Sequence, residues 1–176
     1  MRIVTRTIKL KTFKMKLLNY GFGFIIMVAL LTACSASKQG RTMKKTINGS
    51  WNLQTINTEG INAKFTAKIF NEASLNCFIG SSWDFISNNS TGTYTLVGGT
   101  TGCSTLQRNI SWSIYEPKDA PQEFQFKRLD EKRNPMDDNN GFRLSVTMLD
   151  NNTMQLKSAI TFEGKPGNIV YNFVKK

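Results

Sequence analysis

The stretch MQLKSAITF, residues 154–162, alternates apolar and polar side chains almost throughout. A period of two is typical of a β-strand with one buried side and one solvent-facing side, because successive side chains of a strand point to opposite faces. The same alternation recurs at 51–55, 110–114, 124–127, 144–148 and 169–173. The pattern predicts an all-β domain.

Turn-forming residues separate these stretches. Asp150–Thr153 joins two of them, and its asparagines tolerate the positive φ that tight hairpin turns require. Such boundaries favour a single antiparallel up-and-down barrel of eight strands with at most one short helix, and two packed sheets are the alternative that strand number leaves open. Residues 64–75 fit either a strand or a helical turn. The strands are expected near 47–57, 82–87, 92–98, 106–115, 122–129, 142–149, 153–163 and 167–175.

Large apolar residues at the alternating positions are expected to point into the barrel. They would either fill the interior as a core or line a cavity for a small hydrophobic ligand, and the pattern favours neither reading over the other. The residues of this inward set are Trp51, Tyr94, Trp112, Phe124, Phe126, Met148, Met154, Phe162, Tyr171 and Phe173.

The N-terminal third has the layout of a secretory signal. Residues 1–33 combine a basic start with the apolar run GFGFIIMVALL, and Met15 offers an alternative start codon. The following LTAC, residues 31–34, resembles the lipobox of bacterial lipoproteins, in which the cysteine is lipidated and becomes the first residue of the mature chain. The resemblance implies that Cys34 anchors the protein to a membrane.

The segment after Cys34 is polar and basic. Residues 34–45 show no apolar periodicity, and they are predicted to form a flexible tether before a folded domain at 46–176. Ser35 follows the cysteine where an aspartate would resemble an inner-membrane retention signal. The resemblance to Gram-negative lipoproteins therefore implies the outer membrane, with the domain facing the periplasm.

Two further cysteines, Cys77 and Cys103, lie within the domain. An exported protein meets an oxidising compartment, so we expect these two residues to form a disulfide. A metal site is the rival reading. The chain contains no histidine to complete such a site, and we expect neither a metal nor a cofactor.

The motif Gly49-x-Trp51 opens the first expected strand, in the context INGSWNL at 47–53. It resembles the lipocalin signature, in which the tryptophan closes the narrow end of an eight-stranded barrel. The resemblance to small lipocalin-like lipoproteins extends over about residues 46–176. The arginine that usually covers the tryptophan in that family has no match here, and Lys175 near the end of the last strand is the candidate substitute. The resemblance implies that the barrel binds a small hydrophobic ligand.

Charge and composition narrow the function further. The net charge is +11, but six basic residues and no acidic residue precede Cys34, and their removal leaves +5. The rest of the chain has no basic run paired with stacking aromatics, which argues against nucleic-acid binding. The chain has no histidine, and no spacing of its carboxylates brings a general acid and a general base together, so enzymatic activity is not expected.

The prediction is a membrane-anchored, ligand-binding lipoprotein of the cell envelope. The alternative is a filled barrel that serves as a structural or protein-interaction lipoprotein with an unknown partner, engaged for example through the loop at 130–141.

Overall fold

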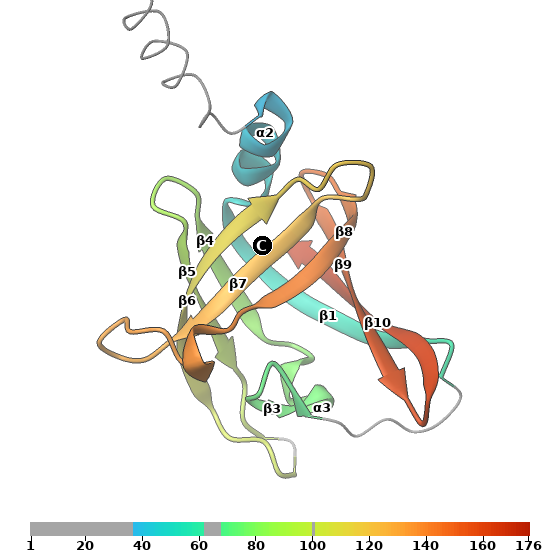
Figure 1. The fold of residues 1–176 in the computed structure, drawn as a ribbon. Helices are drawn as coiled ribbons and strands as arrows, with labels where there is room; N and C mark the ends of the chain where they lie inside the picture. Colours follow the sequence, from blue (N-terminus) through green and yellow to red (C-terminus); the bar gives the residue numbers. More distant parts are fainter. Residues whose placement is uncertain (1–36, 62–67, 100) are drawn as a thin grey trace, which may run out of the picture. The chain divides into compact units, whose positions relative to one another are not determined.

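Eight antiparallel strands close into a barrel in the computed structural model, which describes residues 37–61, 68–99 and 101–176 (Figure 1). The prediction of an eight-stranded up-and-down barrel is confirmed, and the two-sheet alternative is excluded by the closed order β1-β10-β9-β8-β7-β6-β5-β4. Residues 1–33 and Cys34 lie outside the described residues. The barrel strands are β1 (Gly49–Glu59), β4 (Ser82–Ile86), β5 (Thr91–Leu96), β6 (Leu106–Tyr115), β7 (Glu123–Leu129), β8 (Phe142–Leu149), β9 (Thr153–Phe162) and β10 (Lys165–Lys175).

The pairing of the first strand, β1, with the last strand, β10, closes the barrel. Trp51 lies opposite Trp83 of β4 and also opposite Lys175 of β10. Every other pairing in the barrel joins strands that follow one another along the chain, with β2, β3 and α3 inserted between β1 and β4. Closure leaves no barrel edge open for pairing with another chain.

The interior is a single cluster of buried apolar side chains. The residues of the expected inward set that are almost fully buried are Trp51, Tyr94, Trp112, Phe124, Phe126, Met154, Tyr171 and Phe173. Burial at alternating positions follows directly from the period-two pattern of the sequence.

Two residues of the expected inward set do not belong to this core. Met148 is 52% exposed, because a β-bulge between Val146 and Met148 shifts the register of β8 against β9. The extra residue reverses the side of the sheet that later side chains face, so Leu149 packs against the core instead. Phe162 is half-buried at the last residue of β9, beside the turn to β10.

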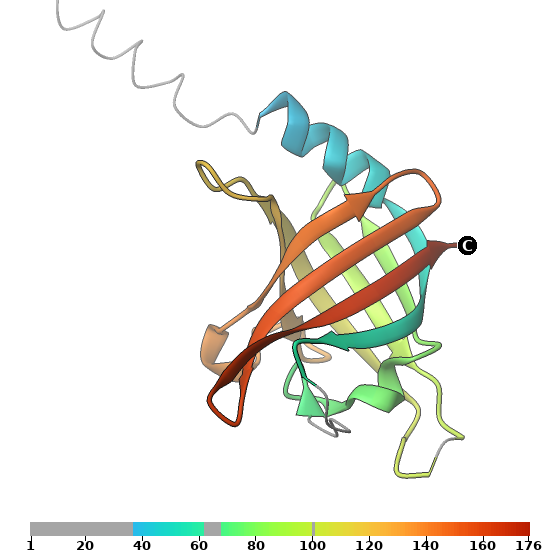
Figure 2. The ribbon, with the colours of Figure 1, turned by 90° about the vertical axis from the view of Figure 1, so that its right-hand side faces the viewer.

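The expected tether is wrong for residues 38–45, because they belong to the helix α2 (Lys38–Ile47). Met43 and Ile47 lie one turn apart on the same side of this helix and pack against the barrel core, where Ile47 is fully buried. Figure 2 shows the helix across one end of the barrel. Two apolar residues in a polar segment are too weak a signal to predict a helix, whose stability here comes from docking.

The tryptophan of the Gly49-x-Trp51 motif lies at this closed end. Gly49 has a φ of +113°, a conformation that favours glycine, and Trp51 is fully buried. Trp51 Nε1 donates a hydrogen bond to the carbonyl of Ile47 at 2.7 Å. Lys175 Nζ lies 5.1 Å from the centre of the Trp51 ring and donates to the carbonyl of Thr46 at 2.9 Å. Lys175 thus covers the tryptophan and binds the C-terminal turn of α2.

Replacing Lys175 by methionine is expected to lower the free energy of unfolding by about 1–2 kcal/mol, because it removes the cation–π contact and the helix-terminal hydrogen bond together. Urea denaturation measures the change. Lys176→Met is the matched control, since Lys176 is exposed and its ammonium group donates to the hydroxyl of Ser82. Equal unfolding midpoints for the two variants would contradict this role of Lys175.

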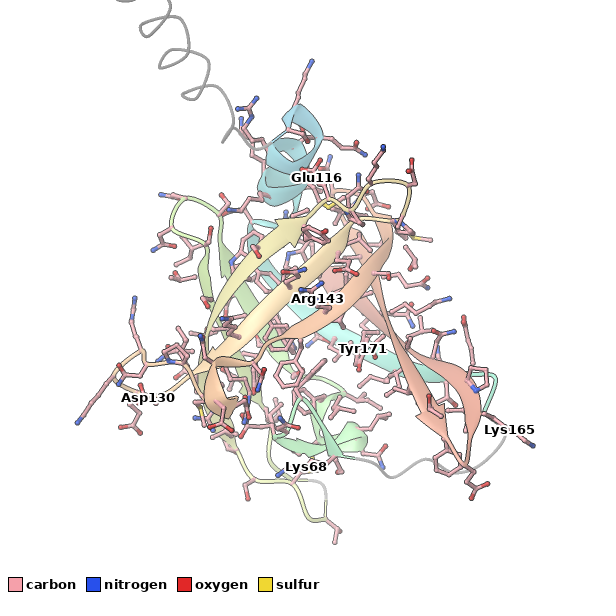
Figure 3. All side chains as sticks on the ribbon, in the orientation of Figure 1. Lys68, Glu116, Asp130, Arg143, Lys165 and Tyr171 are labelled. Atoms are coloured by element: carbon pink, nitrogen blue, oxygen red, sulfur yellow. A yellow bond between two sulfur atoms is a disulfide. The ribbon has the colours of Figure 1, made fainter. Side chains whose placement is uncertain are left out.

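The opposite end of the barrel carries the remaining elements. A short hairpin of β2 (Lys68–Ile69) and β3 (Ala73–Ser74) leads into the helical turn α3 (Leu75–Phe78), so the ambiguous segment at 64–75 contains both kinds of structure in its described part. The 3₁₀ turn η1 (Asp137–Asn139) follows β7. We call this end the mouth. Figure 3 shows Lys68 at the mouth and Glu116 at the end near α2.

Candidate functional site

Three polar side chains occupy inward positions of neighbouring strands at the mouth. Arg108 is two residues before the buried Ile110 on β6, and Arg128 is two residues after the buried Phe126 on β7. Tyr94 of β5 lies directly opposite Arg108 in the strand pairing. Alternation therefore places two guanidinium groups and one hydroxyl on the inner side of the barrel wall.

All three groups converge on the carboxylate of Glu72, which lies in the turn between β2 and β3. Arg108 donates two hydrogen bonds to it, from Nε to Oε2 at 2.8 Å and from Nη2 to Oε1 at 2.9 Å. Arg128 Nη1 lies 2.8 Å from Oε2, and the Tyr94 hydroxyl donates to Oε2 at 2.5 Å. Bidentate, charge-assisted contacts of this kind are among the strongest that proteins make.

A second carboxylate completes the cluster. Asp137 of η1 accepts two hydrogen bonds from Arg128, at 2.8 Å from Nε to Oδ2 and at 2.7 Å from Nη2 to Oδ1. Asn71 also donates to Asp137, at 3.2 Å. Arg128 is only 5% exposed, so its charge depends on these partners rather than on water. The loop at 130–141 is thereby fixed to the mouth.

The cluster holds Glu72 in its charged form. Burial alone would raise the pKa of Glu72, but hydrogen bonds from Arg108, Tyr94 and Arg128 outweigh it and lower the pKa from 4.5 to about 2. Burial and the neighbouring carboxylate raise the pKa of Tyr94, which keeps its hydroxyl a donor. The hydrogen bond to Asp137 raises the pKa of Arg128, and the same bond lowers the pKa of Asp137.

The lowered pKa of Glu72 predicts a dependence of stability on pH. A carboxyl whose pKa is lower in the folded state stabilises the fold above about pH 4.5, and this contribution is lost as the pH falls toward 2. The free-energy difference between the wild type and Glu72→Gln is therefore expected to shrink over this range by on the order of 2 kcal/mol. Denaturant unfolding from pH 7 to pH 2 measures it. A difference that does not change with pH would contradict the prediction.

Phe70, from the same turn as Glu72, lies in the interior of the barrel. Its ring centre is 5.0 Å from that of Phe126, 5.3 Å from Phe142 and 5.4 Å from Tyr171. The rings of Phe78 and Trp83 lie 5.4 Å and 6.2 Å away. Four of these five neighbours come from β7, β8, β10 and β4, so the ring lies between opposite walls of the barrel.

The turn that carries Phe70 has an unusual backbone. Phe70 and Asn71 have φ values of 51° and 52°, in the left-handed region that bulky residues rarely adopt. For Phe70 this conformation costs on the order of 1 kcal/mol or more, whereas asparagine tolerates it, and the cost persists only where surrounding contacts impose it. The contacts here are the ring packing of Phe70 and the ion pairs of Glu72.

The predicted disulfide is confirmed, and it lies at the mouth. Cys77 of α3 is bonded to Cys103 in the connection between β5 and β6, with a Cα–Cα distance of 5.3 Å. The bond ties the segment after Glu72 to the barrel wall on which Tyr94 and Arg108 lie. Together, Phe70, Glu72 and the disulfide fix the hairpin over the mouth.

Sequence reasoning missed the charged residues of this site. The alternation of inward and outward side chains along β6 and β7 would have placed Arg108 and Arg128 inside the barrel, because each continues an alternating run of buried residues. No such signal marks Phe70 or Glu72, whose positions depend on tertiary contacts. Within the described ranges, no cluster of three or more potential metal ligands occurs, and no helix is both long and apolar enough to cross a bilayer.

Comparisons with known proteins show similarity at the level of structure. No family model and no curated protein sequence matches the chain. Among solved structures, the chain is similar to apocrustacyanin C2, with a TM-score of 0.41, and to lobster apocrustacyanin A1, with a TM-score of 0.42. Each match has 13% sequence identity and covers 80% of this chain and 71% of the other.

Proposed function

We propose that this protein binds a small hydrophobic ligand inside its barrel and does so in the cell envelope, anchored by a lipid on Cys34. The anchor rests on the lipobox-like sequence LTAC at residues 31–34 and on the apolar run before it. Ligand binding rests on the lipocalin-like barrel and on the position of Phe70.

Phe70 is the observation that supports ligand binding. The strands alone do not fill the barrel, because a ring from the hairpin at the mouth occupies the space between Trp83, Phe126, Phe142 and Tyr171. An apolar space lined by aromatic rings is a favourable environment for an apolar ligand. Withdrawal of Phe70 would open such a space.

The hairpin is joined to the barrel in a way that permits withdrawal. Strands β2 and β3 form a separate two-stranded sheet with only two residue pairs, and neither strand pairs with the barrel wall. Isolated hairpins of this size have little stability of their own. Release of the strained backbone at Phe70 would offset part of the cost of removing the ring from the core.

The packed interior favours a second candidate function. With Phe70 in place, the barrel is filled in the way a structural core is filled, and the protein would act through its surface as an interaction partner in the envelope. The two functions differ in one measurable property, which is whether the wild-type barrel takes up an apolar molecule.

A fluorescence titration of the purified full-length protein with N-phenyl-1-naphthylamine tests the proposal. We expect saturable binding to the wild type and tighter binding to Phe70→Ala, which removes the competing ring. Tyr115→Ala is the matched control, because Tyr115 is an aromatic residue that is half exposed outside the core. The absence of saturable binding in both the wild type and Phe70→Ala would reject ligand binding and favour the second candidate.

The anchor needs a separate test. In a Gram-negative host fed with radiolabelled palmitate, the wild-type chain should incorporate label and sediment with membranes. Cys34→Ser should incorporate none, whereas Cys103→Ser should still be labelled. Incorporation into Cys34→Ser would overturn the assignment of Cys34 as the lipidated residue.

A further inference from the structure

The mouth of the barrel has the composition of a carboxylate-binding site. Two guanidinium groups and a phenolic hydroxyl point to one place, and the group that they bind is a carboxylate of the protein itself. We propose that the ligand is an amphiphile with one carboxylate and one apolar tail, and that Phe70 and Glu72 occupy its place in this structure. This inference rests on the proposed function, because it names the class of ligand for the same barrel.

Arg108, Arg128 and Tyr94, which we call the carboxylate cradle, match a carboxylate in their geometry. Arg108 presents Nε and Nη2 to the two oxygens of Glu72 at 2.8 and 2.9 Å, the planar arrangement by which arginine recognises carboxylates. The hydroxyl of Tyr94 donates a hydrogen bond to Oε2 of Glu72, and Tyr94 is itself fully buried. Arg108 and Tyr94 lie opposite each other on adjacent strands, so the barrel wall fixes their spacing whether or not the hairpin is present.

The hairpin matches an amphiphilic ligand in the order of its groups. Phe70 places an apolar ring among the aromatic residues of the interior, and Glu72, two positions later, places a carboxylate at the mouth. Asn71 between them reaches outward to Asp137. An apolar tail in the barrel with its carboxylate on Arg108 would make the same two kinds of contact.

The charges at the mouth favour a ligand with a single negative charge. Asp137 makes two hydrogen bonds to Arg128, so Arg108 is the cation that depends on Glu72 alone among the described residues for its ion pair. Replacing Glu72 by one carboxylate of a ligand keeps the balance of two cations and two anions. A neutral ligand would leave Arg108 without an anion in a site where its side chain is only 17% exposed.

Competition between the ligand and the hairpin gives a direct test with two probes, dodecanoate and dodecanol, which share an apolar tail and differ in the carboxylate. Binding is followed by calorimetry and by intrinsic tryptophan fluorescence, to which Trp83 beside Phe70 contributes together with Trp51 and Trp112. Glu72→Gln removes the competing charge and keeps the shape of the side chain. The double variant Glu72→Gln/Arg108→Gln then removes the cradle as well.

We expect dodecanoate to bind Glu72→Gln about ten- to a hundredfold more tightly than it binds the wild type, as charge-assisted hydrogen bonds become available. The double variant should lose this gain. Dodecanol lacks the carboxylate, so it should gain only what the loosened hairpin provides, and by the same amount in the single and the double variant. Glu123→Gln is the matched control, because Glu123 pairs with an arginine on the outer side of the barrel, and it should behave as the wild type. Thermal melts verify that each variant is folded.

The outcomes separate the two proposals. Equal binding of dodecanoate and dodecanol by Glu72→Gln would overturn the carboxylate cradle and leave hydrophobic binding intact. A preference for dodecanoate that survives in the double variant would also overturn it, since the preference would then arise elsewhere. Failure of both probes to bind any of the proteins, Phe70→Ala included, would reject the proposed function itself.

Discussion

Replacing Glu72 by alanine is expected to lower the free energy of unfolding by about 3 kcal/mol. The carboxylate is 91% shielded from solvent in its side chain by the groups around it, and it accepts bonds from Arg108, Arg128 and Tyr94. Its removal leaves the Arg108 guanidinium in a largely buried site without an anion. The value lies at the lower end of the range for broken buried ion pairs, because Asp137 still pairs with Arg128. Denaturant unfolding at pH 7 measures the loss.

A surface ion pair provides the control for this variant. Glu123 Oε2 lies 3.7 Å from Nη1 of Arg143, whose side chain is 67% exposed. Glu123→Ala should therefore change the free energy of unfolding by less than about 1 kcal/mol. A loss for Glu72→Ala no larger than that for Glu123→Ala would show that water, and not Glu72, satisfies the mouth arginines. The carboxylate cradle would then lose its physical basis.

The barrel could be predicted because the sequence signals for its strands and turns are local and recur along the chain. Alternation in MQLKSAITF and in the other stretches fixes which side of each strand is apolar, and turn residues such as those at Asp150–Thr153 fix where strands end. Met148 shows the limit of this reasoning. A bulge adds one residue without any marked signal in the sequence, and every later side chain of that strand then faces the other side.

The candidate site was only half predictable. Arg108 and Arg128 continue alternating runs, so their inward position follows from the same parity that placed Phe126 in the core. Phe70 and Glu72 lie in a turn whose left-handed backbone is imposed by the contacts they make across the barrel mouth. Such a conformation opposes local preference, and local patterns therefore cannot reveal it.

The second large effect is expected from the disulfide. Replacing Cys77 and Cys103 together by alanine should lower the free energy of unfolding by about 3–4 kcal/mol, because the bond closes a loop across a sequence separation of 26 residues. The bond also ties α3 to the connection between β5 and β6, so its loss should free the hairpin that carries Phe70. The double variant should then bind N-phenyl-1-naphthylamine more tightly than the wild type does.

For this variant we expect the free energy of unfolding to fall and the affinity for the dye to rise. A rise in affinity would show that the disulfide controls access to the barrel interior, in addition to stabilising the fold. Ser104→Ala is the control, since Ser104 is exposed beside Cys103 and its replacement leaves the Cys77–Cys103 bond in place; both quantities should stay at their wild-type values. A double variant that is destabilised but gains no affinity would mean that Glu72 and the packing of Phe70 hold the hairpin closed by themselves. The disulfide would then stabilise the barrel without controlling access to its interior.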